Sequence, residues 1–231
     1  MRNYMKSTVT LVAAGALAFS LAACTSGTAT DTNTSAPSSS SSSSPSTGTP
    51  TPVASLASLD GVDTQVAVDA SFLEALTSLG LTPGVSGTAT LSPEGVLAFP
   101  ITGGNVDYYD PAEDYRPYVQ GNIEHDGSGF TLTAGDTTVD LTNFAIDPGT
   151  SKLYGDVLVN GEVAVEGAYL FNLDGTTLKP LQTDDANGTA ILEGTRVLIS
   201  PDAAALLNET FSTDAVQEDM LVGVAKITVN M

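Results

Sequence analysis

The stretch Leu153–Phe171 reads LYGDVLV, then Asn160-Gly161, then EVAVEGAYLF. An Asn-Gly pair suits a two-residue type I′ turn, because both of its residues accept a positive φ. Apolar residues alternate on either side of the pair, as they do in strands with one buried face. The stretch therefore predicts a β-hairpin with strands over 152–159 and 162–172.

Similar turn signals recur along residues 56–231. Asp126-Gly127 separates GNIEH from GFTLTA, and Asp147-Pro148-Gly149, Asp174-Gly175 and Asn187-Gly188 mark further turns. Between them the pattern predicts strands near 64–69, 85–91, 95–101, 118–125, 129–134, 137–146, 189–199 and 221–229. Short turns between so many strands favour antiparallel pairing. We expect a mainly β domain, either a β-sandwich or an open barrel, with two short helices.

The two helices are predicted from their capping residues. Ser71-Phe-Leu-Glu74 is a capping box that opens FLEALTSL, and Gly80 is placed to end that helix. Ser200-Pro201-Asp202 supplies an N-cap, a first-turn proline and an acid before AAALLN. The segments 66–76 and 197–207 align without gaps as strand, N-cap (Asp69 or Ser200) and helix. If they are a structural repeat, we expect the two ends of the domain to lie together.

Composition excludes several classes of function. The 231 residues contain 7 Lys and Arg against 27 Asp and Glu, for a net charge of −20. Nucleic-acid binding needs a dense basic surface, so we expect no nucleic-acid partner. A single Cys and a single His exclude a disulfide within the chain and a metal site made of several thiolates or imidazoles.

The N-terminal residues predict export and a lipid anchor. A basic start (Met1–Lys6) is followed by the apolar run VTLVAAGALAF and by Leu21-Ala22-Ala23-Cys24. This arrangement is that of a secretory signal. The tetrad resembles the lipobox of bacterial lipoproteins, in which the Cys receives acyl chains such as palmitate and becomes the mature N-terminus. The resemblance implies a signal peptide over 1–23, lipidation of Cys24, and a place on the extracytoplasmic face of the cell membrane.

The next segment predicts a flexible stalk. Residues 25–52 consist almost entirely of Ser, Thr, Pro, Gly, Ala, Asn and Asp, with seven consecutive serines at 38–44. Such a segment buries too little apolar surface to offset the entropy of ordering. We therefore divide the chain into a signal peptide (1–23), a lipidated Cys with its stalk (24–55) and a β-rich extracytoplasmic domain (56–231).

The most distinctive candidate site is the acidic, tyrosine-rich stretch 107–118. Hard cations such as Ca²⁺ prefer several loop oxygens, although the spacing here matches no EF-hand. Its tyrosines suggest a contact surface instead, and a solvated loop is the third possibility. His125, at the end of GNIEH, is either a ligand contact or a turn residue. The possible ligand or cation contacts are Asp107, Asp110, Glu113, Asp114, Tyr118 and His125. Glu124 and Asp126 would join them if 104–109 pairs with 118–125.

The order of segments resembles a known family. FPITGG, GNIEHDGSGFTL, VDLTNFAIDPGTSKLYGDV, LFNLDG, the ISPDAAALLN helix and a final strand ending in ITV follow one another over 85–231. This layout is similar to that of actinobacterial HtaA-type cell-surface β-domains. The resemblance implies haem binding, with Tyr118 and His125 as the local candidates for its ligands. The Trp-rich segments of that family have no counterpart here.

Together these observations favour a membrane-anchored lipoprotein that acts as a non-enzymatic binding or display module at the cell surface. Its expected partners are the membrane and a protein or small-molecule ligand, with no obligatory cofactor. The alternative is a receptor lipoprotein for haem or a cation such as Ca²⁺. An extracytoplasmic hydrolase is a second alternative, because acidic residues are abundant.

Overall fold

The computed structural model describes residues 50–231, so the predicted signal peptide, Cys24 and most of the predicted stalk lie outside the described residues. The described part contains one antiparallel sheet and two α-helices, as the turn pattern predicted. Neither helix of these residues is long and apolar enough to cross a membrane. The elements are β1 (Ala54–Leu56), β2 (Gly61–Val68), α1 (Ala70–Ser78), β3 (Thr82–Gly87), β4 (Thr90–Leu91), β5 (Val96–Pro100), β6 (Gly103–Tyr108), β7 (Val119–Ala134), β8 (Thr137–Asp147), β9 (Lys152–Val159), β10 (Glu162–Asp174), the 3₁₀ turn η1 (Gly175–Thr177), β11 (Gln182–Asp184), β12 (Thr189–Ile199), α2 (Pro201–Phe211) and β13 (Leu221–Asn230).

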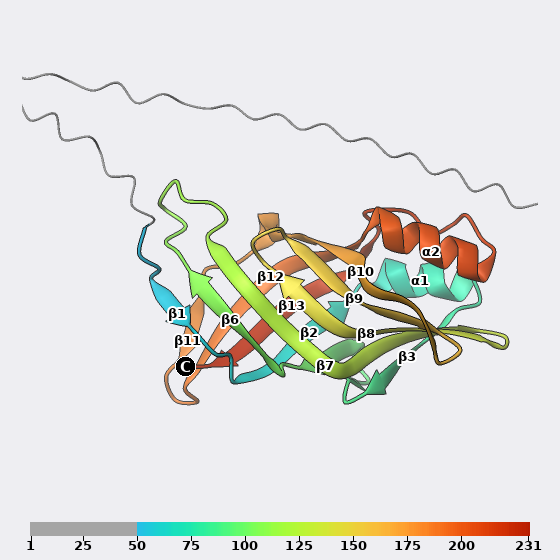
Figure 1. Ribbon diagram of the computed structural model, residues 1–231, viewed down its shortest axis with the longest axis horizontal. Helices are drawn as coiled ribbons and strands as arrows, with labels where there is room; N and C mark the ends of the chain where they lie inside the picture. The colour runs from blue at the N-terminus through green and yellow to red at the C-terminus, as the bar shows by residue number, and fades with distance from the viewer. Residues whose placement is uncertain (1–49) are drawn as a thin grey trace, which may run out of the picture. The chain divides into compact units, whose positions relative to one another are not determined.

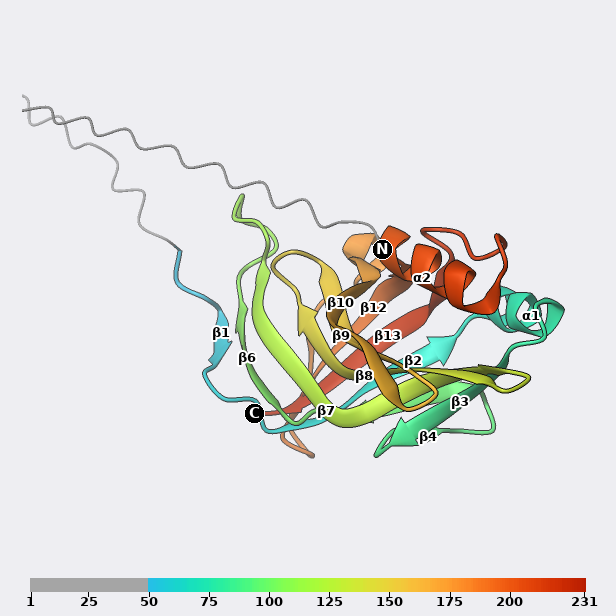
Figure 2. The same cartoon turned by 45° about the vertical axis from the view of Figure 1, so that its right-hand side comes forward.

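The sheet has the strand order β1-β6-β7-β8-β9-β10-β12-β13-β2-β5-β4. Outside this path, β3 pairs with β7, and β11 pairs with β12. The sheet curls into a half-barrel, with α1 and α2 at one end and β1, β6 and the C-terminus toward the other (Figures 1 and 2). The curl brings strands from both ends of the described chain side by side, since β2, the second strand, pairs with the last strand β13 from Gly61 to Val68.

The predicted hairpin over 152–172 is confirmed. Glu162 pairs with Val159, and the turn residues Asn160 and Gly161 have φ values of 54° and 84°. The strand–helix units at both ends also form as expected, and the strands that precede their helices, β2 and β12, flank β13. The helix α2 is capped by Ser200, whose hydroxyl accepts a hydrogen bond from the Ala203 N–H.

Two local predictions were wrong. The capping box at Ser71 is wrong, because the N-cap of α1 is Asp69, which accepts a hydrogen bond from the Ser71 N–H. This finding confirms the N-cap that the alignment of 66–76 with 197–207 gave. Asp126-Gly127 does not separate two strands but lies inside the continuous strand β7. His125 pairs with Phe144 and Gly129 with Thr142, so the three residues between them on β7 oppose a single residue on β8, forming a bulge.

The bulge of β7 belongs to a line of irregularities that bends the sheet. The Gly127 N–H donates to Asn143 Oδ1 on β8, and Asn143 Nδ2 donates to Asp156 on β9. Asp156 in turn accepts from the Gly167 N–H on β10. Asn143 and Gly167 both have positive φ, at 53° and 60°. This polar line divides the sheet into a half that packs on the helices and a half that curls away from them.

Each half has its own apolar core. The larger cluster packs both helices against the sheet through residues such as Phe72, Leu76 and Leu207. The smaller cluster, beyond the bulges, contains the buried residues Leu59, Ile101, Ile123 and Ile146. Aliphatic side chains from β6 and β13 that pack on this second cluster stay partly exposed, because a cavity opens beside them.

Candidate ligand-binding site

A cavity of about 720 Å³ lies in the half of the sheet that carries no helix. Its size falls within the range typical of small-molecule sites in proteins. Segments far apart in the sequence form its wall, from β1 at the start of the described chain to β13 at its end. The lining comprises Ala54, Leu56, Leu59, Val106, Tyr108, Arg116, Pro117, Tyr118, Val119, Ile123, Ile146, Pro148, Ser151, Leu173, Asp174, Gly175, Thr176, Leu178, Leu181, Ala190, Leu192, Thr195, Ala225, Ile227 and Val229.

The floor of the cavity is aliphatic because alternate residues of the strands face it. On β13 the residues Ala225, Ile227 and Val229 line the cavity, and their neighbours Val224 and Lys226 do not. Side chains of a strand point to opposite faces in turn, so this alternation follows from the strand itself. The floor thus presents Leu, Ile, Val and Ala side chains to whatever enters.

One rim is built by β6, the loop 109–118 and the start of β7. The rings of Tyr108 and Tyr118 meet edge to face, with centroids 6.0 Å apart. Burial raises the pKa of Tyr108, and a hydrogen bond from the Leu181 backbone N–H acts in the opposite direction. That contact links β6 to the segment before β11, on the far side of the cavity.

Arg116 is held in this rim by backbone groups. Its guanidinium donates to the carbonyl oxygens of Glu113 (2.6 Å), Tyr115 (2.9 Å) and Pro111 (3.0 Å). It also lies over the Tyr118 ring, 5.4 Å from the ring centroid. These contacts fix the position of the cation without neutralising its charge.

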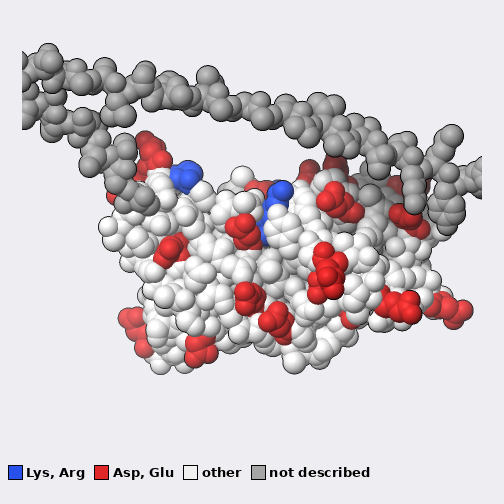
Figure 3. Space-filling model, in the orientation of Figure 1, with Lys and Arg blue, Asp and Glu red and all other residues white. Residues whose placement is uncertain are grey.

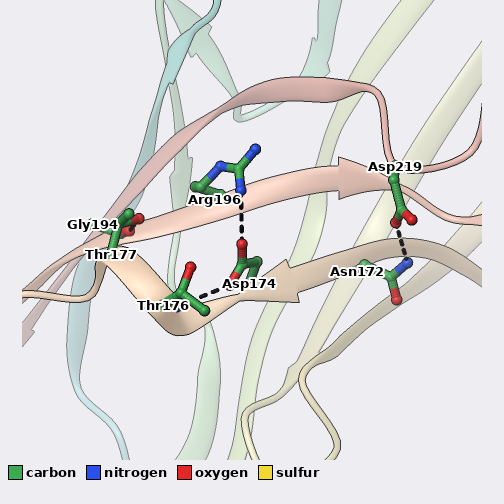
Figure 4. A network of polar contacts seen from close by, with 7 residues as sticks. All are labelled: Asn172, Asp174, Thr176, Thr177, Gly194, Arg196 and Asp219. Carbon is green, nitrogen blue, oxygen red and sulfur yellow. Dashed lines mark hydrogen bonds and ion pairs between the residues drawn. The ribbon is translucent and has the colours of Figure 1, made fainter.

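The opposite rim carries a carboxylate that is already engaged (Figure 4). Asp174 caps η1 by accepting from the Thr176 N–H at 2.9 Å, and it accepts from Arg196 Nη1 at 2.8 Å. The hydrogen bonds from Thr176, followed by the contact with Arg196, hold the pKa of Asp174 below its usual value despite some desolvation. Asp174 is the one carboxylate among the described residues that line the cavity.

The structure does not bring three of the acidic side chains of 107–118 together. Asp107 accepts a hydrogen bond from Ser55 Oγ across the β1–β6 pair, and Asp110 accepts from the Ala112 N–H in its own turn. Glu113 and Asp114 are exposed. Within residues 50–231, no three Asp, Glu, His or Cys side chains converge as metal ligands.

Pairing of β6 with β7 does not bring Glu124 and Asp126 to this loop. Glu124 pairs with Gly103, at the opposite end of β6 from Asp107, which pairs with Gln120. β6 does pair with β7, but the pairing places Glu124 at the end of β6 that is farthest from the loop. Residues 110–114 and Arg116 are exposed, as expected for a solvated loop, whereas Tyr109 is buried against Tyr115, with ring centroids 4.6 Å apart.

His125 is a core residue and not a surface ligand. It is 1% exposed, and its Nε2 lies 2.8 Å from Thr64 Oγ1 while Nδ1 lies 3.3 Å from the Phe144 carbonyl oxygen. Since a carbonyl only accepts, Nδ1 carries the proton and Nε2 accepts from the Thr64 hydroxyl. Burial lowers the pKa of His125 to about 4, so the ring is neutral at pH 7. The residue lies outside the cavity lining, among apolar side chains beneath it.

The sequence analysis missed most of the cavity. Of the six possible ligand or cation contacts, Tyr118 alone lines the cavity; Tyr108, expected only as part of a tyrosine contact surface, lines it too, and Arg116 was not predicted. The strand pattern contained a usable signal, because Ala225, Ile227 and Val229 alternate with Val224, Lys226 and Thr228. That pattern identifies an inward face, but it does not indicate that the face lines a cavity.

Comparison with known proteins agrees on the fold alone. No family model and no curated protein matches the sequence. The structure is similar to the C-terminal domain of HtaA from Corynebacterium glutamicum. The likeness has a TM-score of 0.51 at 16% sequence identity, and it covers 74% of this chain and 97% of that domain.

A domain-swapped dimer of a single-residue variant of the same HtaA domain is also similar. Its TM-score is 0.42 at 13% identity, over 70% of this chain and 92% of that one. At 16% identity the likeness to the C-terminal domain of HtaA supports a similar arrangement of strands and helices, and it assigns no ligand to the cavity.

Proposed function

We propose that the domain is a non-enzymatic binding module that holds an apolar molecule in the cavity. The observation that carries this proposal is a cavity of about 720 Å³ with an aliphatic floor and a few polar groups at its rim. Sites of this kind gain affinity from the apolar floor and orientation from the polar groups. Asp174 is the one carboxylate among the described lining residues and is paired with Arg196, so these residues offer no second acid for hydrolysis.

We further propose that the module works outside the cytoplasm, attached to the membrane through Cys24. The support comes from the signal-like N-terminus and the Leu21–Cys24 tetrad. Residues 25–52 would then separate the domain from the bilayer by roughly 30 Å as a flexible coil. A binding module at that distance is able to take a ligand from the medium or from the membrane surface.

A neutral fluorescent probe tests whether the cavity binds apolar molecules. N-Phenyl-1-naphthylamine should become brighter and shift to the blue when added to the protein. Ile227→Trp should abolish the change, because the larger ring fills the floor that Ile227 lines. Val224→Trp is the matched control, since Val224 lies on the same strand, is 38% exposed and does not line the cavity. No probe binding by the wild type, or equal binding by Ile227→Trp, would refute the proposal.

Haem is the second candidate ligand, favoured by the likeness to the HtaA domain and by two phenols at the rim. His125 does not fit as an iron ligand, because it lies outside the cavity and both of its nitrogens are hydrogen-bonded. Tyr118 would be the donor to iron, and Arg116 would face a haem carboxylate. Bound haem would supply redox or transport chemistry, and this chain would provide the enclosure together with the contacts of Tyr118 and Arg116.

Absorbance spectroscopy separates haem from other ligands. Haemin added to the protein should give a shifted Soret band if haem binds, and Tyr118→Phe should change its position. Tyr115→Phe is the control, because Tyr115 packs on Tyr109 and does not line the cavity. A spectrum identical to that of free haemin would remove haem from consideration and leave the apolar-ligand proposal standing.

A further inference from the structure

The shape of the floor gives information about the ligand. Tyr108 and Tyr118 are the aromatic residues in the described lining, and both lie at the rim. The floor beneath them is made of branched aliphatic side chains from β7, β8, β12 and β13, including Ile123, Ile146 and Ile227. Planar ligands gain from stacking on aromatic faces, whereas saturated chains need only apolar area and fit irregular aliphatic walls. This floor therefore suits a flexible aliphatic chain better than a planar ring system.

The charge at the rim gives a second, independent indication. Over the described residues, the structure holds two side-chain ion pairs, Lys179–Glu193 and Arg196–Asp174. Arg116 belongs to neither, although the chain contains 27 acidic residues. In the view of Figure 3 acidic side chains are spread over the visible face of the domain, and basic ones are few. An arginine with no carboxylate partner in such a protein, placed beside an apolar cavity, is suited to an anion.

The groups around Arg116 leave its charge available. Its three hydrogen bonds go to carbonyl oxygens of its own loop, which are neutral. The nearby carboxylate Asp110 is engaged with the Ala112 N–H. On the opposite rim, the charge of Asp174 is compensated by Arg196. The cavity thus has one uncompensated charge among its described lining residues, and that charge is positive.

We propose that the cavity binds an anionic amphiphile, with its aliphatic tail on the floor and its head group at Arg116. The inference rests on the proposed function, since it names the ligand class of the same cavity. A free long-chain fatty acid and an anionic membrane lipid share this chemistry. Both place a charged group at the end of a saturated chain, and the experiment below distinguishes them.

The test measures displacement of N-phenyl-1-naphthylamine from the full chain carrying Cys24→Ser, so that no attached lipid competes. The displacement constant of hexadecanoate should be about tenfold lower than that of hexadecan-1-ol. The reason is that the acid alone accepts a charge-assisted hydrogen bond from Arg116. Arg116→Gln should remove that preference and Arg116→Lys should retain most of it. Lys226→Gln is the matched control, because it removes the same charge from the non-lining face of β13.

Chain length provides a second measurement. Displacement constants for carboxylates of eight to fourteen carbons should tighten by roughly fourfold for each added methylene until the cavity is full. Displacement by hexadecanoate in preference to lysophosphatidylglycerol would assign a free fatty acid, and the reverse order would assign a membrane lipid.

The failures are distinguishable. Probe binding without any preference for the acid over the alcohol, or a preference unchanged in Arg116→Gln, would overturn this inference and leave the proposed function intact. Loss of probe binding by the wild type would instead overturn the proposed function. Displacement by haemin alone, with a shifted Soret band, would assign the cavity to haem and also overturn the inference.

Discussion

Acidification should destabilise the protein through His125, and the structure gives the size of the effect. The ring is buried, accepts from the Thr64 hydroxyl and donates to the Phe144 carbonyl oxygen, so the folded state holds it neutral. Its pKa of about 4 lies below the value near 6.5 of the unfolded chain. Between these values the unfolded state binds more protons, and stability therefore falls as the pH falls.

The magnitude follows from linkage. A pKa difference of about 2.5 units corresponds to about 3 kcal/mol in full, of which about 2 kcal/mol should be lost between pH 7 and pH 5. Carboxyl groups with lowered pKa values, such as Glu193 and Asp174, add their losses mainly below about pH 4.5. The window from pH 7 to pH 5 therefore isolates the histidine.

Urea unfolding followed by circular dichroism at pH 7, 6 and 5 measures this effect. The wild type should lose stability progressively, whereas His125→Gln should be less stable at pH 7 and nearly independent of pH down to pH 5. Thr64→Val provides a second variant, because it removes the donor to Nε2 and leaves the titrating ring in place. A wild-type stability that stays constant over this range, or an equal loss in His125→Gln, would refute the reasoning.

Three further predictions concern other parts of the chain. Gly121→Ala should lower the free energy of unfolding in urea by about 2 kcal/mol or more. Gly121 has a φ of 125°, and an added Cβ would lie 2.0 Å from the Asn105 carbonyl oxygen. Gly175→Ala should lower it far less, because no atom lies within 4 Å of the added Cβ. Cys24→Ser should abolish labelling of the protein by a clickable fatty acid in cells, and an unlabelled wild-type protein would contradict the lipobox prediction. Millimolar Ca²⁺ should leave the thermal melting temperature unchanged. A rise in melting temperature that is abolished by Asp110→Asn and Asp114→Asn would instead indicate a calcium site in the stretch 107–118.

The sequence was most informative where structure depends on neighbouring residues. The hairpin at Asn160-Gly161 was predictable, because the turn needs two positive φ values and this pair accepts them. The cap of α2 was predictable for the same kind of reason, since Ser200 and Pro201 act within one helical turn. The antiparallel β class followed from many such turns taken together.

Local sequence patterns were misleading where contacts with distant residues decide whether a motif forms a turn or a bulge. Asp126-Gly127 is as good a turn signal as Asn160-Gly161, yet it forms a bulge. The bulge is stabilised by contacts from other strands, since the Gly127 N–H donates to Asn143 and its carbonyl accepts from the Thr88 N–H of the segment after β3. Neither partner is near the motif in the sequence. His125 precedes the bulge on the same face of β7 as the buried Ile123, and it is a core residue for that reason.

By itself, the sequence determined the β class, the hairpins, the second helix cap and the expectation of export, because each depends on residues within a few positions of one another. Tertiary structure alone decided the cavity, since its wall joins Ala54 on β1 to Val229 on β13 and exists only when the sheet curls. It also decided that Arg116 has no carboxylate partner among the described residues, despite its acidic neighbours. Loop carbonyl oxygens bind the guanidinium and hold it beside the cavity. The cavity wall joins strands that lie far apart in the sequence, and their arrangement depends on long-range packing, which no local pattern encodes.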